Sequence, residues 1–142
     1  NFIDIDEEIE NSSGVSISWI FDVEGENKFR ERESKELEKS LETDNCVIST
    51  GGGVILREQN RNIIKKGTVI YLETSIQTQL ERTLNDKKRP LLLGSKDKEQ
   101  TLRELKEIRD PFFKECANIT IKGDKNSHNE VVEEIINLLN LT

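Results

Sequence analysis

The chain has 142 residues, which is enough for one domain with a single buried core. Charged residues make up 35% of it and hydrophobic residues 33%, and the apolar residues gather in short runs, which argues against a disordered chain. No apolar run approaches the roughly 20 residues that a membrane helix needs, and the net charge of −7 argues against nucleic acid as a partner.

Four short apolar runs predict strands, at 1–5, 46–50, 68–73 and 118–122. Three of them are nearly continuous in Val, Ile, Leu or Phe, which is typical of strands covered on both faces. Helical patterns cover 6–13, 16–24, 26–41, 75–85 and 98–109, the last ended by Pro111. A capping box at Ser127 opens a final helix, whose apolar residues between Val131 and Leu139 form its expected buried face. Strands that alternate with helices predict one α/β domain over 1–142 with a parallel sheet.

Cysteine usage bears on the compartment of the protein. Cys46 and Cys116 match neither a C-x-x-C motif nor a zinc spacing, and each belongs to an apolar pattern. We therefore expect two reduced thiols in the core, as in a cytoplasmic protein. We also expect a monomer.

Residues 86–97 form a long segment between two helical patterns. After Asp86 come three basic residues, Lys87-Lys88-Arg89, then Pro90-Leu91-Leu92-Leu93-Gly94 and a polar end. A loop of this length that exposes leucines beside an arginine is uncommon unless it closes over a ligand. We interpret it as a lid; a surface loop with a small hydrophobic anchor is the alternative.

Two strand ends carry residues suited to chemistry, because ligands of open α/β sheets bind at the carboxyl ends of the strands. Asp4 and Asp6 leave the first strand and, two residues apart on a strand, would face the same side. One carboxylate would then bind a hydrated Mg²⁺ and the other would contact a substrate hydroxyl. The alternative is that both are simply charges at a helix N-terminus. Gly51-Gly52-Gly53 follows the second strand and, without Cβ atoms, allows backbone N–H groups to approach a ligand; a plain tight turn is the alternative.

Arg30 and Arg109 are candidates for binding a carboxylate. Glu33 lies three positions after Arg30 on the same helix face, where it can hold the guanidinium in one orientation. Arg109 directly precedes Asp110-Pro111, at the expected end of a helix. Each could be an ordinary surface charge, whereas together they would form a bidentate clamp for a substrate carboxylate.

In order along the chain, these motifs resemble the shikimate kinases. The resemblance covers essentially all 142 residues and is carried by Phe2-Ile3-Asp4-Ile5-Asp6, Gly25-Glu26, Phe29-Arg30, Glu33, Ser49-Thr50-Gly51-Gly52-Gly53, Val69-Ile70-Tyr71-Leu72, Arg89-Pro90-Leu91-Leu92 and Arg109. It implies the three-layer fold of P-loop kinases, with a parallel sheet in the order 2-3-1-4-5. It also implies transfer of the γ-phosphate of ATP to the 3-hydroxyl of shikimate, in aromatic amino acid (chorismate) biosynthesis.

The resemblance further implies a role for each site residue. Those implied to hold shikimate are Asp6, Phe21, Phe29, Arg30, Glu33, Gly52, Gly53 and Arg109. Asp6 is the implied base or positioning group for the attacking hydroxyl, and Asp4 is implied to order Mg²⁺ through water. Arg89 in the lid is implied to reach over the ATP phosphates and to take part in catalysis. Arg82 and the loop with Lys125 are implied to lie near the adenine, although this loop departs from the family's usual sequence. The implied substrate-binding region covers about 6–45.

The family's phosphate-binding loop is not found in these 142 residues. None of the eight glycines is followed by lysine, so the chain contains no Walker A motif. In the family, a strand, this loop and a helix come before the F-x-D-x-D strand, and that first strand lies in the middle of the sheet. Because these elements are absent here and the chain begins at Asn1 rather than at Met, we expect an N-terminally truncated domain whose four strands flank a gap or are rebuilt around it.

Three hypotheses remain open at this point. The first, which we favour, is an enzyme whose N-terminal segment is not in this chain, since the aspartate, both clamp arginines and the lid arginine are all present. The second is a non-catalytic module that has lost ATP binding and keeps only a substrate pocket or a partner surface. The third is a sugar or nucleoside kinase of the same fold, which would not need a carboxylate clamp.

Overall fold

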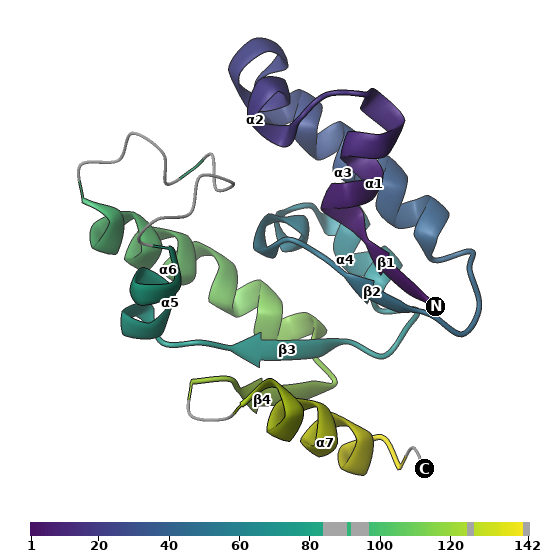
Figure 1. Ribbon diagram of the computed structural model, residues 1–142, viewed down its shortest axis with the longest axis vertical. Coiled ribbons are helices and arrows are strands. Elements are labelled where there is room, and N and C mark those ends of the chain that lie inside the picture. The colour runs from purple at the N-terminus through teal and green to yellow at the C-terminus, as the bar shows by residue number, and fades with distance from the viewer. Residues whose placement is uncertain (84–90, 92–96, 125–126, 141–142) are drawn as a thin grey trace.

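Two parallel strand pairs form the framework of the computed structural model, which describes residues 1–83, 91, 97–124 and 127–140 (Figure 1). Strand β1 (Phe2–Asp4) pairs with β2 (Val47–Ser49), and β3 (Ile70–Glu73) pairs with β4 (Ile119–Lys122). Within the described residues no ladder joins β2 to β3, so the strand order is β1-β2 and β3-β4. This arrangement agrees with the expected α/β fold. In that fold the two strand pairs lie on either side of the position of the family's first strand, in the middle of the sheet.

The first half of the chain packs a helical layer onto β1 and β2 (Figure 1). Its elements are α1 (Ile5–Ser13), α2 (Ile17–Trp19), the π-helical turn η1 (Ile20–Glu24), α3 (Glu26–Ser40), the 3-10 turn η2 (Gly52–Leu56) and α4 (Glu58–Ile64). Their buried core consists of Ile5, Ile9, Ile20, Phe29, Leu37, Val54 and Ile63. The predicted helix 16–24 is therefore interrupted: Ser16 caps a short α-helix, and a wider turn then runs to Gly25.

The second half contains α5 (Ile76–Thr83), α6 (Lys98–Cys116) and α7 (His128–Leu138). The last two residues of the helix predicted at 75–85 lie outside the described residues. Helix α6 overturns a prediction, because it continues through Pro111 to Cys116 instead of ending before the proline. Packing outweighs the lost backbone hydrogen bond here: the Phe113 ring stacks on Tyr71 at 4.4 Å, and Cys116 is buried.

Helix α7 confirms its predicted cap but not its predicted buried face. Ser127 and Glu130 form the capping box, with the Glu130 carboxylate 2.6 Å from the Ser127 nitrogen. None of its residues is buried, and Val132 is 51% exposed and Leu138 52% exposed. In Figure 1 the helix lies beside β4 at the edge of the molecule, where a two-stranded sheet offers little surface to cover it.

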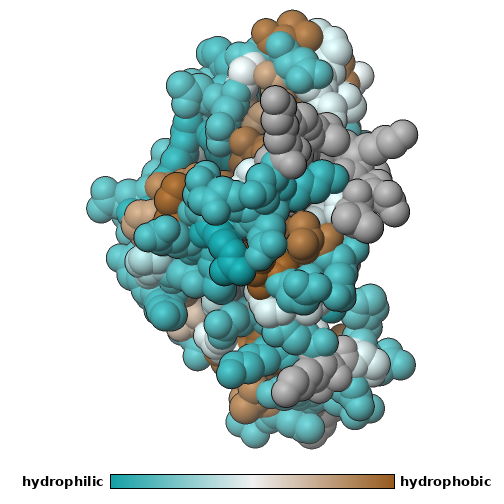
Figure 2. All heavy atoms as spheres, turned by 90° about the vertical axis from the view of Figure 1, so that its left-hand side faces the viewer, coloured by the Kyte–Doolittle hydropathy of each residue, from teal (hydrophilic) through white to brown (hydrophobic). Residues whose placement is uncertain are grey.

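The surface is mostly hydrophilic on the side of α5 and of the start of α6. Figure 2 shows apolar side chains there in small separate patches rather than in one band. Among the described residues, no helix has the length and apolar character required to cross a membrane.

Candidate active site

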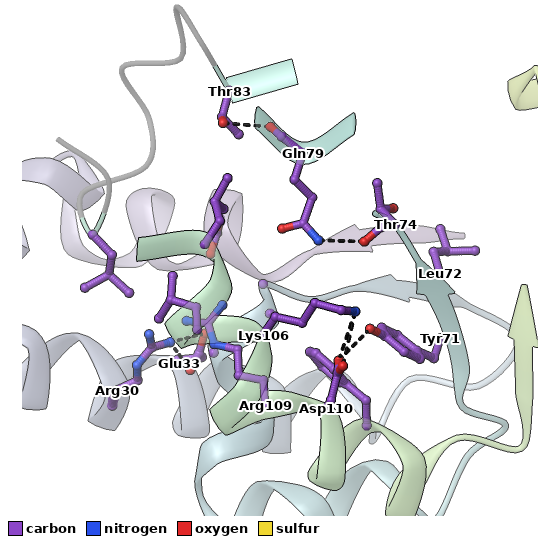
Figure 3. A pocket seen from close by; sticks show the side chains of 18 of the residues that line it. Arg30, Glu33, Tyr71, Leu72, Thr74, Gln79, Thr83, Lys106, Arg109 and Asp110 are labelled. Carbon is purple, nitrogen blue, oxygen red and sulfur yellow. Dashed lines mark hydrogen bonds and ion pairs between the residues drawn. The ribbon is translucent and has the colours of Figure 1, made fainter. Parts of the chain in front are cut away.

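A cavity of about 330 Å³ lies between the first half of the chain and helix α6 (Figure 3). This volume is at the lower end of the range for small-molecule sites. The residues predicted to hold the substrate all line it: Asp6, Phe21, Phe29, Arg30, Glu33, Gly52, Gly53 and Arg109. The structure thus brings together residues that the sequence spreads over more than 100 positions, while their individual roles remain predictions.

Arg30 is held from two sides by carboxylates of its own helix. Its Nη1 donates to both oxygens of Glu33, at 2.9 and 3.2 Å, and its Nη2 donates to Glu26 at 3.4 Å. The Glu33 side chain is only 1% exposed, and this burial raises its pKa, an effect that the nearby Arg30 opposes. The predicted bracing of Arg30 by Glu33 is therefore confirmed as a contact. The Nε of Arg30 is buried and finds no hydrogen-bond partner among the described residues.

The glycine turn is needed for a reason that the sequence did not indicate. None of its three residues has a positive φ. Instead, a Cβ on Gly53 would overlap the Arg30 guanidinium, and a Cβ on Gly52 would lie 3.0 Å from Nη1 of Arg109. The missing side chains thus make room for two guanidinium groups that converge on the same turn.

Arg109 lies within α6, one turn before Phe113, rather than at a helix end. The next residue, Asp110, accepts a hydrogen bond from the Tyr71 hydroxyl at 3.2 Å and pairs with Lys106 at 3.1 Å (Figure 3). Burial and the Asp110 carboxylate raise the pKa of Tyr71 above its usual value. Sequence reasoning missed this network; its only signal was the spacing of Lys106 and Asp110, four residues apart on a helix.

The two aspartates do not share a strand face. Strand β1 ends at Asp4, and Asp6 already belongs to the first turn of α1. The Asp4 carboxylate caps that helix by accepting the backbone N–H groups of Asp6 at 2.9 Å and Glu7 at 3.2 Å. The strand-face expectation is therefore wrong, because the cap bends the chain between the two residues, and only Asp6 lines the cavity.

The residues predicted to contact ATP are only partly covered by the structure. Arg82 donates to the carbonyl of Gly123 at 3.3 Å, which joins α5 to the loop after β4. Arg89 and Lys125 lie outside the described residues, as does most of the predicted lid. Of the lid, the structure describes Leu91, which lines the cavity, and Asp97, which caps α6.

Comparison with known proteins identifies the family. The family model described as "Shikimate kinase" matches residues 1–140. The chain belongs to the shikimate kinase family. A shikimate kinase from Histophilus somni is 46% identical over 139 residues, which make up 97% of this chain and 79% of that protein. A second shikimate kinase, from Legionella pneumophila, is 47% identical over 139 residues, with the same coverage of both chains.

Solved structures of shikimate kinases confirm the fold. The shikimate kinase of Acinetobacter baumannii in complex with shikimate superposes with a TM-score of 0.95 at 41% identity, over 99% of this chain and 78% of that one. The Aquifex aeolicus shikimate kinase gives a TM-score of 0.81 at 37% identity, over 98% and 80% of the two chains. Shikimate kinases are ATP-dependent phosphotransferases, so these matches do not favour a non-catalytic module.

Proposed function

We propose that the protein transfers the γ-phosphate of ATP to the 3-hydroxyl of shikimate, whose carboxylate binds between Arg30 and Arg109. The observation that carries this proposal is the convergence of both guanidinium groups on the Gly52-Gly53 turn, inside a cavity that Asp6 also lines. Two arginines are the groups best suited to a planar carboxylate. The relative from Acinetobacter baumannii, whose structure is a complex with shikimate, supports this choice of substrate.

In this proposal the protein acts mainly by positioning and by charge. Phosphoryl transfer requires an aligned hydroxyl and neutralisation of the charge on the moving phosphoryl group. Asp6 would accept or orient the hydroxyl proton, while the rings of Phe21 and Phe29, 4.7 Å apart, form one wall for the substrate. Arg89 would stabilise the phosphates from the lid, and closure of the lid would exclude water.

ATP is proposed to bind with Mg²⁺, which supplies charge neutralisation on the phosphates. The described residues contain no group of three or more His, Cys, Asp or Glu side chains that could hold a metal ion. Mg²⁺ usually keeps several waters and is held by one or two carboxylates together with substrate phosphates. Asp4 is proposed to reach it through water, and Arg82 and Lys125 to lie on the adenine side.

We also propose one domain over 1–142, with a substrate-binding region at about 6–45 and a lid at about 86–97. A monomer in the cytoplasm remains our proposal. Both cysteines are free thiols; Cys116 is buried as expected, whereas Cys46 is only partly buried, so the core position predicted for Cys46 is wrong. Burial raises the pKa of Cys116.

The clamp predicts a loss of shikimate binding in two variants. Arg109→Ala and Arg30→Ala should each weaken shikimate binding by about 2–3 kcal/mol, as expected when a charge-assisted contact is lost. Calorimetric titration of the purified protein measures the effect. Arg103→Ala is the matched control, because Arg103 lies on the same helix as Arg109 but pairs at the surface with Glu99, at 2.7 Å.

Thermal unfolding must accompany these titrations, because Arg30→Ala leaves the buried Glu33 carboxylate without its main partner. Arg109→Ala is therefore the cleaner of the two tests. A shikimate affinity that is unchanged in Arg109→Ala would refute the clamp.

Because residues 1–142 contain no Walker A motif, turnover experiments are designed on a P-loop fusion, in which a strand, a Walker A loop and a helix are placed ahead of Asn1. In this fusion, Asp4→Asn and Asp4→Ala should both raise the Mg²⁺ concentration needed for activity, because both remove the charge. Only Asp4→Ala should also lower the free energy of unfolding, by about 1 kcal/mol, since asparagine still caps α1. An unchanged Mg²⁺ dependence in both variants would leave Asp4 with a capping role alone.

A further inference from the structure

Arg61 of helix α4 makes contacts in two directions. Its Nη1 donates to the carbonyls of Ile55 at 2.9 Å and Leu56 at 3.1 Å. Its Nε pairs with Glu115 at 3.1 Å, and its guanidinium lies 4.1 Å from the centre of the Phe112 ring. The Arg61 side chain is only 13% exposed, whereas the Glu115 side chain is 50% exposed. The contacts with the two carbonyls and the ring therefore hold the guanidinium more firmly than the half-exposed ion pair does.

The partners of Arg61 belong to the two elements that form one side of the clamp. The two carbonyls end η2, the turn that begins with Gly52 and Gly53. Phe112 and Glu115 lie on α6 within two turns of Arg109. Arg61 therefore connects the glycine turn with the helix that carries Arg109, although it does not line the cavity itself.

The distance between η2 and α6 can change only a little without affecting Arg109. A Cβ on Gly52 would already lie 3.0 Å from Nη1 of Arg109. A small shift of α6 relative to η2 would thus either press Arg109 against the turn or move it away from a ligand carboxylate, and bidentate contacts depend steeply on such distances.

We infer that Arg61 is a positioning residue that sets the distance between Arg109 and the glycine turn, and through it the affinity for the carboxylate of the substrate. This inference rests on the proposed function. Lysine cannot replace Arg61, because a single ammonium group on a flexible stem cannot contact the carbonyls, the carboxylate and the ring together. Lys65 pairs with the same Glu115 at 3.5 Å but is seen in no contact with η2 or with Phe112 among the described interactions.

The test is a double-mutant cycle on shikimate binding, measured by calorimetry on the purified protein. Arg61→Lys should weaken shikimate binding about tenfold in the parent. In the Arg109→Ala background it should have almost no further effect, because the contact that it positions is already gone. Lys65→Gln is the matched control and should leave the affinity unchanged. Glu115→Gln removes the ion pairs of this carboxylate with Arg61 and with Lys65, and the Lys65→Gln control isolates the second of them. Glu115→Gln should show the same dependence on Arg109 if Arg61→Lys does not fold.

The possible results separate the positioning role of Arg61 from the proposed carboxylate clamp on which it rests. A loss of affinity of the same size in both backgrounds would mean that Arg61 only stabilises the fold, and would overturn the inference. A loss in Arg109→Ala with none in Arg61→Lys or Glu115→Gln would refute the inference alone. Equal affinity of Arg109→Ala and the parent would refute the clamp, and the inference would fall with it.

Discussion

A polypeptide of residues 1–142 on its own is expected to show no ATP-dependent phosphorylation of shikimate. No glycine in it is followed by lysine, so it lacks a Walker A loop. Such a loop provides backbone N–H groups at a helix N-terminus for the β-phosphate, a lysine that bridges the β- and γ-phosphates, and a hydroxyl for Mg²⁺. Asp4, the glycine turn and the lid arginine cannot replace these three anchors, because each acts on a phosphate that is already positioned.

The measurement is release of ADP that depends on shikimate, compared between the 142-residue polypeptide and the P-loop fusion. We expect turnover only in the fusion. The fusion with the Walker A lysine changed to alanine is the control, because it keeps the added strand and helix and removes one phosphate contact. Measurable turnover by the 142-residue polypeptide would show that phosphate binding relies on other residues of this chain.

Asp6→Asn in the P-loop fusion is expected to lower turnover by a factor of about 10²–10⁴, the usual contribution of a general base. Asparagine has nearly the same shape but cannot accept the hydroxyl proton. The backbone hydrogen bond from residue 6 to Asp4 does not involve the side chain, so the start of α1 should be preserved. Affinities for shikimate and for Mg·ATP should therefore stay within a few-fold of the parent.

Glu7→Gln is the matched control for Asp6→Asn. Glu7 is the next residue on α1, its backbone N–H also bonds Asp4, and its side chain is exposed. Single-turnover kinetics separate the chemical step from product release. Turnover in Asp6→Asn that stays within a few-fold of the parent would leave Asp6 as a binding residue only.

Much of this site could be predicted because its signals are local. Ser16 and Ser127 are N-cap residues, and each marks the start of a helix in the sequence. The predicted bounds of the four strands differ from the observed bounds by at most two residues. The Arg30–Glu33 pair follows from helical spacing alone. The cavity as a set of residues came from the family resemblance, since no local pattern relates Asp6 to Arg109.

What could not be predicted depends on contacts between distant elements. Pro111 is a helix breaker in sequence, yet α6 is continuous and packs against Tyr71 through Phe113, a contact that no local pattern predicts. The need for glycine at position 53 depends on the approach of a guanidinium from another helix. Arg61 has no distinguishing sequence pattern, because its partners come from residues 55, 56, 112 and 115.

The central claim is that this cavity recognises its substrate through the carboxylate. The most direct measurement compares the binding of shikimate with that of its methyl ester, which keeps the ring and the hydroxyl groups but has no charge. If Arg30 and Arg109 hold the carboxylate, the ester should bind more weakly by about 2–3 kcal/mol, and Arg109→Ala should remove most of that difference. If shikimate and the ester bind the parent protein equally well, the two arginines do not form a carboxylate clamp and the account is wrong.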